Sequence, residues 1–339
     1  MVSKTKNEST RSLDQKISRI LAGKYQPSDF IIADAKDADL SVGLMAAGAN
    51  AGHQMGDSGP DVYPTRQVHL VQMQALMDQG QIDIMLASAA NVEKLAQKPG
   101  NSERVTLAIR GNDATDIWNP RSSDYQASAS RPFQSVNLDK TREFCDLALY
   151  SLTFNNDLDA DLRSLEAYRE FRIHSAKLGV RHFLEVFNPN APSNLSPSDF
   201  GGFVNDSIIR ALAGVTQAER PLFLKIPYNG SIHLQELSGH DSTLVVGLLG
   251  GSAGTTRDTF ELLRRGEQAG ARVALFGRKI QRSESQLDLV ALMRPVIEGS
   301  ITPVQAVEQY HEILERQGLP SQRTLEDDLV ITDPILRAE

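Results

Sequence analysis

One lysine lies inside an apolar segment of the sequence. Lys225 falls within residues 221–226, between Leu224 and Ile226, and a Pro-Tyr-Asn-Gly turn follows. An ammonium group is costly to bury, so burial would lower the pKa of this lysine and leave a nucleophilic amine. Schiff-base chemistry needs such an amine. The alternative is a lysine paired with a carboxylate inside the protein, with no chemistry of its own.

Two glycine-containing loops follow the next two apolar segments. The first contains Gly250, Gly251 and Ser252, and the second contains Gly277 and Arg278. Glycines let the backbone approach a phosphate closely and direct its N–H groups inward, and an arginine adds a two-pronged contact. These loops therefore predict a phosphate site. The alternative is that the glycines only form tight turns.

A carboxylate interrupts another apolar run. Glu185 lies within residues 182–187, and the alternation of a strand directs it away from the side taken by Leu184 and Val186. If Glu185 faces inward near Lys225, it is a candidate for proton transfer.

The first apolar segment continues into an Asp- and Lys-containing stretch. Asp34 and Lys36 share one face of a strand that we expect to end near Asp37. We expect one of these acids to act as a base or to hold the charge of the lysine.

Three further polar residues lie at strand ends. Arg110 and Asp113 follow the third apolar segment, and Tyr150 lies late in the fourth, where it is a candidate for proton transfer. For each residue alone, a structural ion pair or an exposed loop charge is the alternative.

Other chemistries lack their sequence signals. The seven histidines show neither an HxH nor an HExxH pattern, and no GxSxG motif is present. The single cysteine, Cys145, lies in a mostly apolar stretch and is interpreted as a small buried hydrophobe. We therefore expect neither a metal nor an organic cofactor.

Eight short apolar segments alternate with stretches that have helical patterns. The helical stretches include 162–177 and 259–268. Alternating strands and helices predict a parallel sheet, and eight such units in about 250 residues suit a (β/α)₈ barrel. An open doubly wound sheet is the alternative, but no GxGxxG turn follows the first strand. The predicted strands are 30–33, 82–86, 105–109, 147–152, 182–187, 221–226, 244–249 and 273–276.

The ends of the chain fall outside this barrel. We expect an N-terminal extension over 1–29 with a helix at 13–22, a barrel domain over 30–318, and a C-terminal tail over 319–339 that packs on a neighbouring chain. A helix that starts at Pro303 and stops at Gly318 completes the barrel. Long connections at 111–141 and 188–203 are expected to build or cover the site.

The composition limits the partners. The net charge is −8 and no Lys/Arg-rich run is present, which argues against a nucleic-acid or membrane surface. The polar N-terminus and the strand-sized apolar runs predict a cytoplasmic protein.

The last three strands resemble those of the class I aldolases of the DhnA/DeoC/LacD type. The likeness is carried by Lys225 in Lys-Ile-Pro-Tyr-Asn-Gly, by Gly250-Gly251-Ser252, and by the turn from Gly277 through Lys279. The resemblance implies a (β/α)₈ barrel, a Schiff base on Lys225 and phosphate held after the last two strands. It also implies a homo-oligomer and no cofactor.

Three positions depart from the family pattern. The fifth strand offers Glu185 and Phe187 where the family often has a tyrosine, and Lys279 stands where the family has an asparagine. The aspartate of the first strand is not followed by His-Gly.

The sequence therefore predicts a Schiff-base aldolase or lyase that acts on a phosphorylated keto sugar or a related small metabolite. Two alternatives keep the barrel. One is an isomerase in which Lys225 acts only through its charge, and the other is a non-catalytic protein that binds a phosphorylated metabolite.

Overall fold

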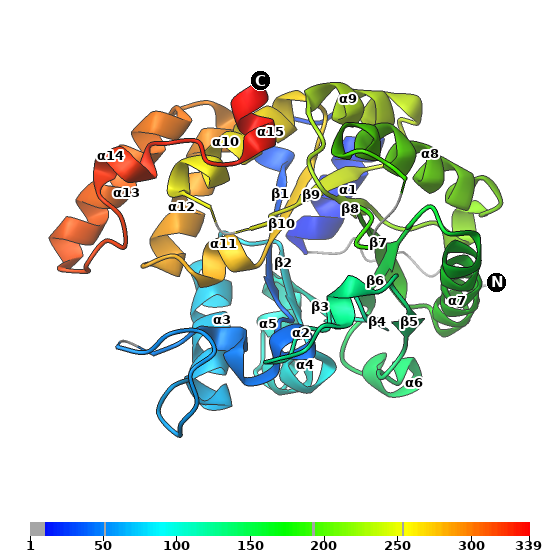
Figure 1. The fold of residues 1–339 in the computed structure, drawn as a ribbon, viewed down its shortest axis with the longest axis horizontal. Helices are drawn as coiled ribbons and strands as arrows, with labels where there is room; N and C mark the ends of the chain where they lie inside the picture. Colours follow the sequence, from blue (N-terminus) through cyan, green and yellow to red (C-terminus); the bar gives the residue numbers. More distant parts are fainter. Residues whose placement is uncertain (1–10, 51, 192–193, 253) are drawn as a thin grey trace, which may run out of the picture.

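All eight predicted strands pair in one closed parallel barrel in the computed structural model of the protein (Figure 1). The structure describes residues 11–50, 52–191, 194–252 and 254–339. The order of strands around the barrel is β1-β10-β9-β8-β7-β6-β3-β2. The chain therefore has a (β/α)₈ fold, and the doubly wound alternative is wrong. The barrel strands are β1 (Ile31–Lys36), β2 (Ile84–Ala87), β3 (Thr106–Arg110), β6 (Leu147–Thr153), β7 (Arg181–Phe187), β8 (Leu224–Ile226), β9 (Val246–Leu249) and β10 (Val273–Phe276).

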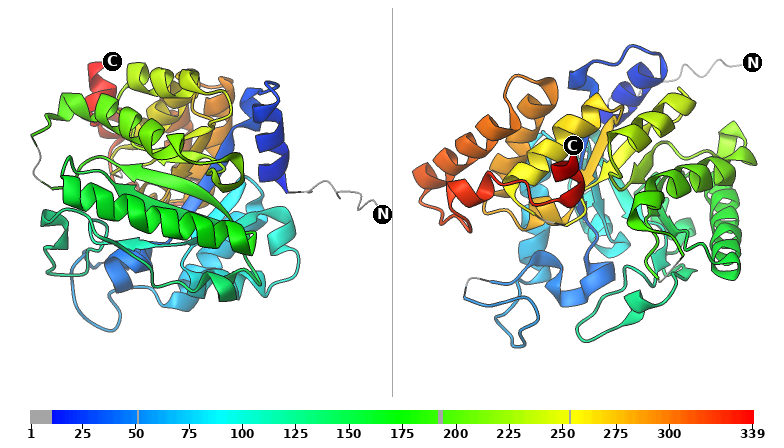
Figure 2. Two further views of the ribbon diagram at one scale, coloured as in Figure 1. Left: turned by 90° about the vertical axis from the view of Figure 1, so that its right-hand side faces the viewer. Right: turned by 45° about the horizontal axis from the view of Figure 1, so that its top comes forward.

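Helices surround the barrel, and the two views of Figure 2 show them on its outside. The longer helices are α1 (Ser12–Leu21), α3 (Arg66–Gln79), α4 (Ala89–Ala96), α7 (Leu158–Leu178), α8 (Phe200–Ala213), α9 (Ser231–His240), α10 (Thr256–Gln268), α12 (Gln286–Glu298) and α13 (Pro303–Gln317). The short ones are α2 (Asp39–Val42), α5 (Asn101–Arg104), α6 (Leu138–Thr141), α11 (Arg278–Gln281), α14 (Leu325–Asp328) and α15 (Pro334–Ala338).

Two helices begin earlier than the apolar pattern predicts, because capping residues start them. Thr255 accepts a hydrogen bond from the backbone N–H of Asp258, and the Asp258 carboxylate accepts one from the N–H of Thr255. This reciprocal capping box starts α10. Asp157 caps α7 in the same way by accepting from the N–H of Ala160.

The side-chain alternation of the strands divides the apolar core into two clusters. One cluster takes residues from every barrel strand segment and from α1, but from no surrounding helix, so it fills the interior. It includes Ala33 and Ala35 of β1 and Phe183 of β7. The other cluster combines the alternate strand residues with the apolar faces of the helices, and therefore lies outside the barrel.

Helix α1 closes the N-terminal end of the barrel. Its Leu13 and Ile17 are buried and belong to the interior cluster. A helix forms here as expected, whereas residues 1–10 of the predicted extension lie outside the described residues. With that end closed, the C-terminal ends of the strands form the other face, where sites of this fold are found.

The C-terminal segment packs on its own barrel. Helix α15 contacts α10, and α14 contacts α13. Leu336 and Asp328 are buried in these contacts. Leu336 and Asp328 of the predicted tail thus find partners within the same molecule, whereas Leu325, Val330 and Ile335 are exposed. Packing of this tail on a neighbouring chain stays a prediction.

The long connection after β3 forms a small hairpin. Its strands β4 (Asp113–Ala114) and β5 (Pro132–Phe133) pair antiparallel. Trp118 stacks on Tyr125 between them, with ring centroids 4.6 Å apart.

We predict that Gly247→Ala destabilises the barrel while Gly202→Ala does not. An added Cβ at Gly247 would lie 2.6 Å from the carbonyl oxygen of Leu224 and 2.8 Å from the Cβ of Val273, whereas nothing lies within 4 Å at Gly202. Overpacking of this kind costs about 1–3 kcal/mol, while the helical Gly202 exchange should be neutral or stabilise by up to about 1 kcal/mol. Urea unfolding of both variants measures the difference. Equal unfolding free energies for the two would contradict the described packing.

Candidate active site

Lys225 and Glu185 face each other inside the barrel, at the C-terminal ends of adjacent strands. Leu224 and Ile226 belong to the outer cluster, so Lys225 between them points inward. The strand register aligns Glu185 with Lys225. The Lys225 Nζ lies 2.6 Å from the Glu185 Oε1, and both side chains are buried. The pair predicted from the two apolar strands is thus brought together.

Arg110, at the end of β3, connects this pair to β1. Its Nε donates to Asp37 Oδ2 over 2.6 Å, and its terminal nitrogen donates to Glu185 Oε2 over 3.2 Å. Its other terminal nitrogen donates to the Ser151 hydroxyl over 2.8 Å, and that hydroxyl donates to Glu185 Oε2 over 2.6 Å. Four charged groups of alternating sign are therefore joined across the mouth of the barrel.

Opposite charges in this cluster stabilise one another. Burial opposes ionisation of Asp37, but Arg110 and Lys225 together hold the pKa of its carboxyl below the ordinary value. Burial likewise opposes the charge of Arg110, but Asp37 and Glu185 raise the pKa of the guanidinium. Opposite charges at short range favour the ionised forms, so Asp37 and Arg110 stay charged even though burial opposes their charges.

The arrangement suits proton transfer to and from an amine. Glu185 is within hydrogen-bond distance of the Lys225 Nζ, as a base must be to take its proton. Gly247, the register partner of Lys225 on β9, adds no side chain on the inner face beside the lysine. The amine therefore has a base on one side and no competing side chain on the other.

The predicted phosphate loops follow β9 and β10, as expected from the sequence. Gly251 has a φ of 64°, a left-handed conformation that favours glycine. Cβ atoms added at Gly250 and Gly277 would lie 3.0 Å from the Phe276 ring and 2.9 Å from the Ala35 carbonyl oxygen. Both glycines thus have a packing role, and their part in phosphate binding stays a prediction.

Arg278 is the cation best placed to serve these loops. It begins α11 and is partly buried, and its side chain makes neither a hydrogen bond nor an ion pair among the described residues. Burial, and next the charge of Arg282, lower its pKa, while Glu185 acts in the opposite direction. The influence of Glu185 indicates that Arg278 lies on the same side of the barrel as the charged cluster.

Asp34 and Lys36 are not part of this cluster. They do share one face, as predicted, but it is the outer face of β1, because Ala33 and Ala35 take the inner one. Their charged atoms lie 3.3 Å apart, and Lys36 also donates to Gln286 of α12 over 2.9 Å. The structure therefore does not bring them into the charged cluster, because they face the surrounding helices. The inward acid is the next in alternation, Asp37.

Tyr150 also points away from the cluster. Its ring packs against Tyr168 and Phe171 of α7, with centroid distances of 5.0 and 4.6 Å. Its neighbour Ser151 faces inward instead and contacts Glu185. The alternation of side chains along a strand would have predicted Ser151 on the inner face, because residues one step apart point to opposite faces.

Asp113 lies beside the cluster without joining it. Its carboxylate accepts hydrogen bonds from the backbone and the hydroxyl of Ser135 in the hairpin. Its charge contributes to the raised pKa of Arg110. It is therefore a neighbour that favours the arginine charge rather than a member of the hydrogen-bonded network.

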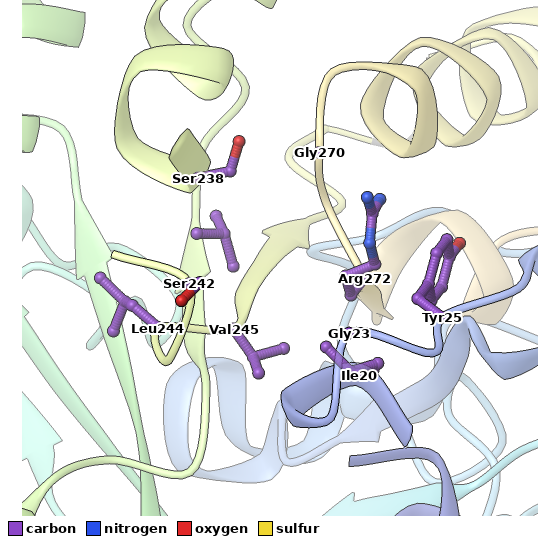
Figure 3. Close-up of a pocket in the computed structure, with 10 residues that line it drawn as sticks. Ile20, Gly23, Tyr25, Ser238, Ser242, Leu244, Val245, Gly270 and Arg272 are labelled. Carbon is purple, nitrogen blue, oxygen red and sulfur yellow. The ribbon is translucent and has the colours of Figure 1, made fainter. Parts of the chain in front are cut away.

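A pocket lies at the opposite end of the barrel (Figure 3). Its lining includes Ile20 of α1, Val245 just before β9, and Arg272 just before β10. Arg272 lies over the ring of Tyr25, 3.9 Å from its centroid. The N-terminal ends of the strands and helix α1 build this pocket, so it is separate from the Lys225 cluster.

Neither a membrane-spanning helix nor a metal site is found among the residues that the structure describes. No helix of the described chain is both long and apolar enough to cross a membrane. No group of three or more His, Cys, Asp or Glu side chains there is arranged to hold a metal ion.

Solved structures similar to this chain include aldolases. An archaeal fructose 1,6-bisphosphate aldolase matches with a TM-score of 0.60 and 13% identity, over 85% of this chain and 99% of its own. A Schiff-base-forming fructose-1,6-bisphosphate aldolase matches with a TM-score of 0.59 and 14% identity, over 84% of this chain and 99% of its own. A Corynebacterium glutamicum protein matches with a TM-score of 0.58 and 16% identity, over 89% of this chain and 99% of its own.

No protein-family model and no curated protein matches the chain. The structural likeness concerns the fold, and at this level the resemblance predicted from the sequence is confirmed: the chain shares its (β/α)₈ fold with these two fructose-1,6-bisphosphate aldolases.

The buried pair on the outer face of β1 gives a pH prediction. Burial raises the pKa of Asp34 to about 6, from the ordinary 3.8, against the opposing effect of Lys36. The folded state therefore binds this proton more tightly than the unfolded state, and the pair lowers the free energy of unfolding as pH rises from about 4 to about 6, by on the order of 3 kcal/mol. We expect Asp34→Asn/Lys36→Met to lose this pH dependence.

Urea unfolding at several pH values measures the wild-type minus variant difference, in which the other groups cancel. The exposed pair Asp78 and Lys98, 3.1 Å apart, provides the matched control as Asp78→Asn/Lys98→Met. The hydrogen bond from Lys98 lowers the pKa of Asp78, so any slope there has the opposite sign. A flat difference curve for the Asp34/Lys36 pair would contradict the prediction.

Proposed function

We propose that this protein is a Schiff-base aldolase or lyase that cleaves or forms a carbon–carbon bond in a phosphorylated keto substrate. The observation that carries the proposal is the 2.6 Å contact between Lys225 Nζ and Glu185 Oε1 inside the mouth of the barrel. The similar fold of a Schiff-base-forming fructose-1,6-bisphosphate aldolase supports it.

Glu185 activates the lysine. It takes a proton from the ammonium, and the neutral Nζ then attacks the carbonyl carbon of the substrate. The carbinolamine that forms loses water after its hydroxyl is protonated, and the product is an iminium. For cleavage, a base removes the proton of the hydroxyl on the carbon beyond the bond that breaks, and the bonding electrons move to the iminium nitrogen. An aldehyde leaves, and the enamine is protonated and hydrolysed.

Asp37 and Arg110 support these steps. Asp37 is an ionised carboxylate at the rim of the cluster, and we assign it the role of the second proton-transfer group in place of Asp34 and Tyr150. Arg110 binds both carboxylates, 2.6 Å from Asp37 and 3.2 Å from Glu185. This contact keeps the two acids apart and orients Glu185 toward Lys225.

The phosphate group of the substrate is assigned to the two loops. Backbone N–H groups of Gly250, Gly251 and Ser252 and of Gly277 approach it, and the guanidinium of Arg278 completes the contact. A phosphate held there fixes the distance between the substrate carbonyl and Lys225. A cytoplasmic location and a homo-oligomer stay predictions of the sequence.

The test is borohydride trapping. We expect incubation with dihydroxyacetone phosphate and other phosphorylated ketoses, followed by reduction, to leave an adduct on Lys225 in peptide mass maps. Lys225→Met should abolish the adduct, and Glu185→Gln should slow its formation by about 100-fold, the usual effect of losing a positioned acid or base.

Lys279 provides an internal control for the trapping experiment, because it is a second buried lysine that could form an adduct. It is buried, and burial lowers its pKa to about 8 against the opposing charges of Asp258 and Asp333. A lowered pKa leaves a larger share of this lysine as the neutral amine, which is the form that reacts with a carbonyl. An adduct on Lys279 in place of Lys225 would overturn the assignment. Interconversion of phosphorylated sugars without any adduct would favour the isomerase, and binding without turnover would favour a metabolite-binding protein.

A further inference from the structure

The C-terminal segment 324–339 runs back across the helices that follow β8, β9 and β10. Figure 1 shows α14 and α15 at the C-terminal end of the ribbon, and the right-hand view of Figure 2 shows α15 beside α10. The loops assigned to phosphate directly precede α10 and form the start of α11. The segment therefore lies where it can fix these loops.

Asp328 makes the first connection. Its Oδ1 accepts a hydrogen bond of 2.8 Å from the backbone N–H of Thr256, the first residue of α10. Its Oδ2 lies 3.0 Å from the Nε2 of His311 on α13. Thr255 donates its hydroxyl proton to the carbonyl oxygen of Val330 over 2.8 Å. The N-terminus of α10 is thus held by the segment just after the Gly250–Ser252 loop.

Asp258 makes the second connection, from the barrel side. Its Oδ1 accepts from the backbone N–H groups of Thr332 and Asp333 over 2.8 and 3.2 Å, and the Thr332 hydroxyl donates to its Oδ2. Burial opposes its charge, but these hydrogen bonds and the one from Thr255 hold the pKa of its carboxyl below the ordinary value. The same carboxylate therefore caps α10 and binds the segment.

Lys279 makes the third connection, to the loop after β10. It follows Arg278 directly and is only 6% exposed. The carboxylates of Asp258 and Asp333 both act on its charge. Lys279 stands where the resembling family has an asparagine, and here the charge of Asp333 in the segment raises its pKa against the effect of burial. Its neighbour Arg278 is left for a ligand.

Glu339 makes the fourth connection, beside the strand that carries Lys225. Its carboxylate accepts from the Tyr228 hydroxyl over 2.6 Å and from the backbone N–H of Ser231 over 2.5 Å. Ser231 is the first residue of α9. Carboxylates of the segment therefore occupy the N-termini of both α9 and α10, where a helix favours negative charge.

We propose that segment 324–339 is a positioning element for phosphate binding, with Asp328 as its main positioning residue. It holds the loops after β9 and β10 in the geometry that accepts a phosphate. By filling the N-termini of α9 and α10 with its own carboxylates, it leaves Arg278 and the two glycine loops as the place for the anion. The inference rests on the phosphate part of the proposed function and is independent of the Schiff base.

The experiment compares Asp328→Ala with Asp139→Ala in the full chain. Asp139 is the matched control, because its carboxylate also lies 3.0 Å from a histidine Nε2, that of His174, but on the side of α6 and α7. Calorimetric titration with inorganic phosphate and with dihydroxyacetone phosphate should show affinity weakened by about tenfold or more in Asp328→Ala, or about 1.4 kcal/mol. Asp139→Ala should bind as the wild type does.

A second measurement distinguishes the loss of loop positioning from a general loss of the folded site. Trapping of unphosphorylated dihydroxyacetone on Lys225 should be the same in Asp328→Ala and in the wild type, while trapping of dihydroxyacetone phosphate should need a higher concentration. Hydrogen exchange of the 250–258 backbone should be faster in the variant. Wild-type phosphate affinity in folded Asp328→Ala, or an equal loss for both ketones, would overturn the inference.

Thr332→Val decides the matter if Asp328→Ala does not fold. It removes only the hydroxyl that bonds Asp258, and weakened phosphate affinity in this variant supports the inference, while unchanged affinity refutes it. A wild-type protein that binds no phosphate would refute both this inference and the assigned phosphate site. In that case, an adduct of dihydroxyacetone on Lys225 would still support the Schiff base. If instead phosphate binds and no adduct forms on Lys225, only the Schiff base is refuted.

Discussion

The contact between Lys225 and Glu185 is the constraint on which the rest of the site depends. An ammonium buried in a closed barrel is tolerated only if a carboxylate lies against it, and breaking such a pair costs about 3–5 kcal/mol. The carboxylate needs partners for its other oxygen, and Arg110 and Ser151 provide them. Arg110 in turn requires Asp37. One buried lysine thus accounts for the polar side chains that four strands and the residue after β1 contribute to the same level of the barrel.

The alternation of side chains along each strand decides which of them can reach the charged cluster inside the barrel. In β6, β7 and β8 the residues next to the inward polar groups belong to the outer cluster, where they pack against helices. On the outer face of β1, Asp34 and Lys36 form an ion pair, and Lys36 also donates to Gln286 of α12. Neighbouring residues of a strand therefore face the barrel interior and the helices in turn. A polar residue in a strand can be assigned a role in the site only when the face that it occupies is known.

The two ends of the barrel are built for different purposes. Leu13 and Ile17 of α1 close the N-terminal end with apolar contacts, which contribute stability. The C-terminal end carries the charged cluster, the glycine loops and the terminal segment. The segment brings acidic side chains to two helix N-termini, so it stabilises these helices and removes two competing places where an anion would bind.

The barrel, its strands and the two central residues of the candidate site can all be predicted from the sequence. Short Val-, Ile- and Leu-rich runs in alternation with amphipathic stretches specify a parallel barrel locally, and a Lys and a Glu inside such runs are visible as exceptions. Which acid near the end of β1 faces inward follows from the folded barrel alone, because Asp34 and Asp37 point to opposite faces and the closed barrel sets which face is inner. The tertiary structure also decided that Ser151 replaces Tyr150, and that the terminal segment folds onto its own α10. These depend on contacts between residues distant in sequence, such as Asp258 with Thr332, which no local pattern encodes.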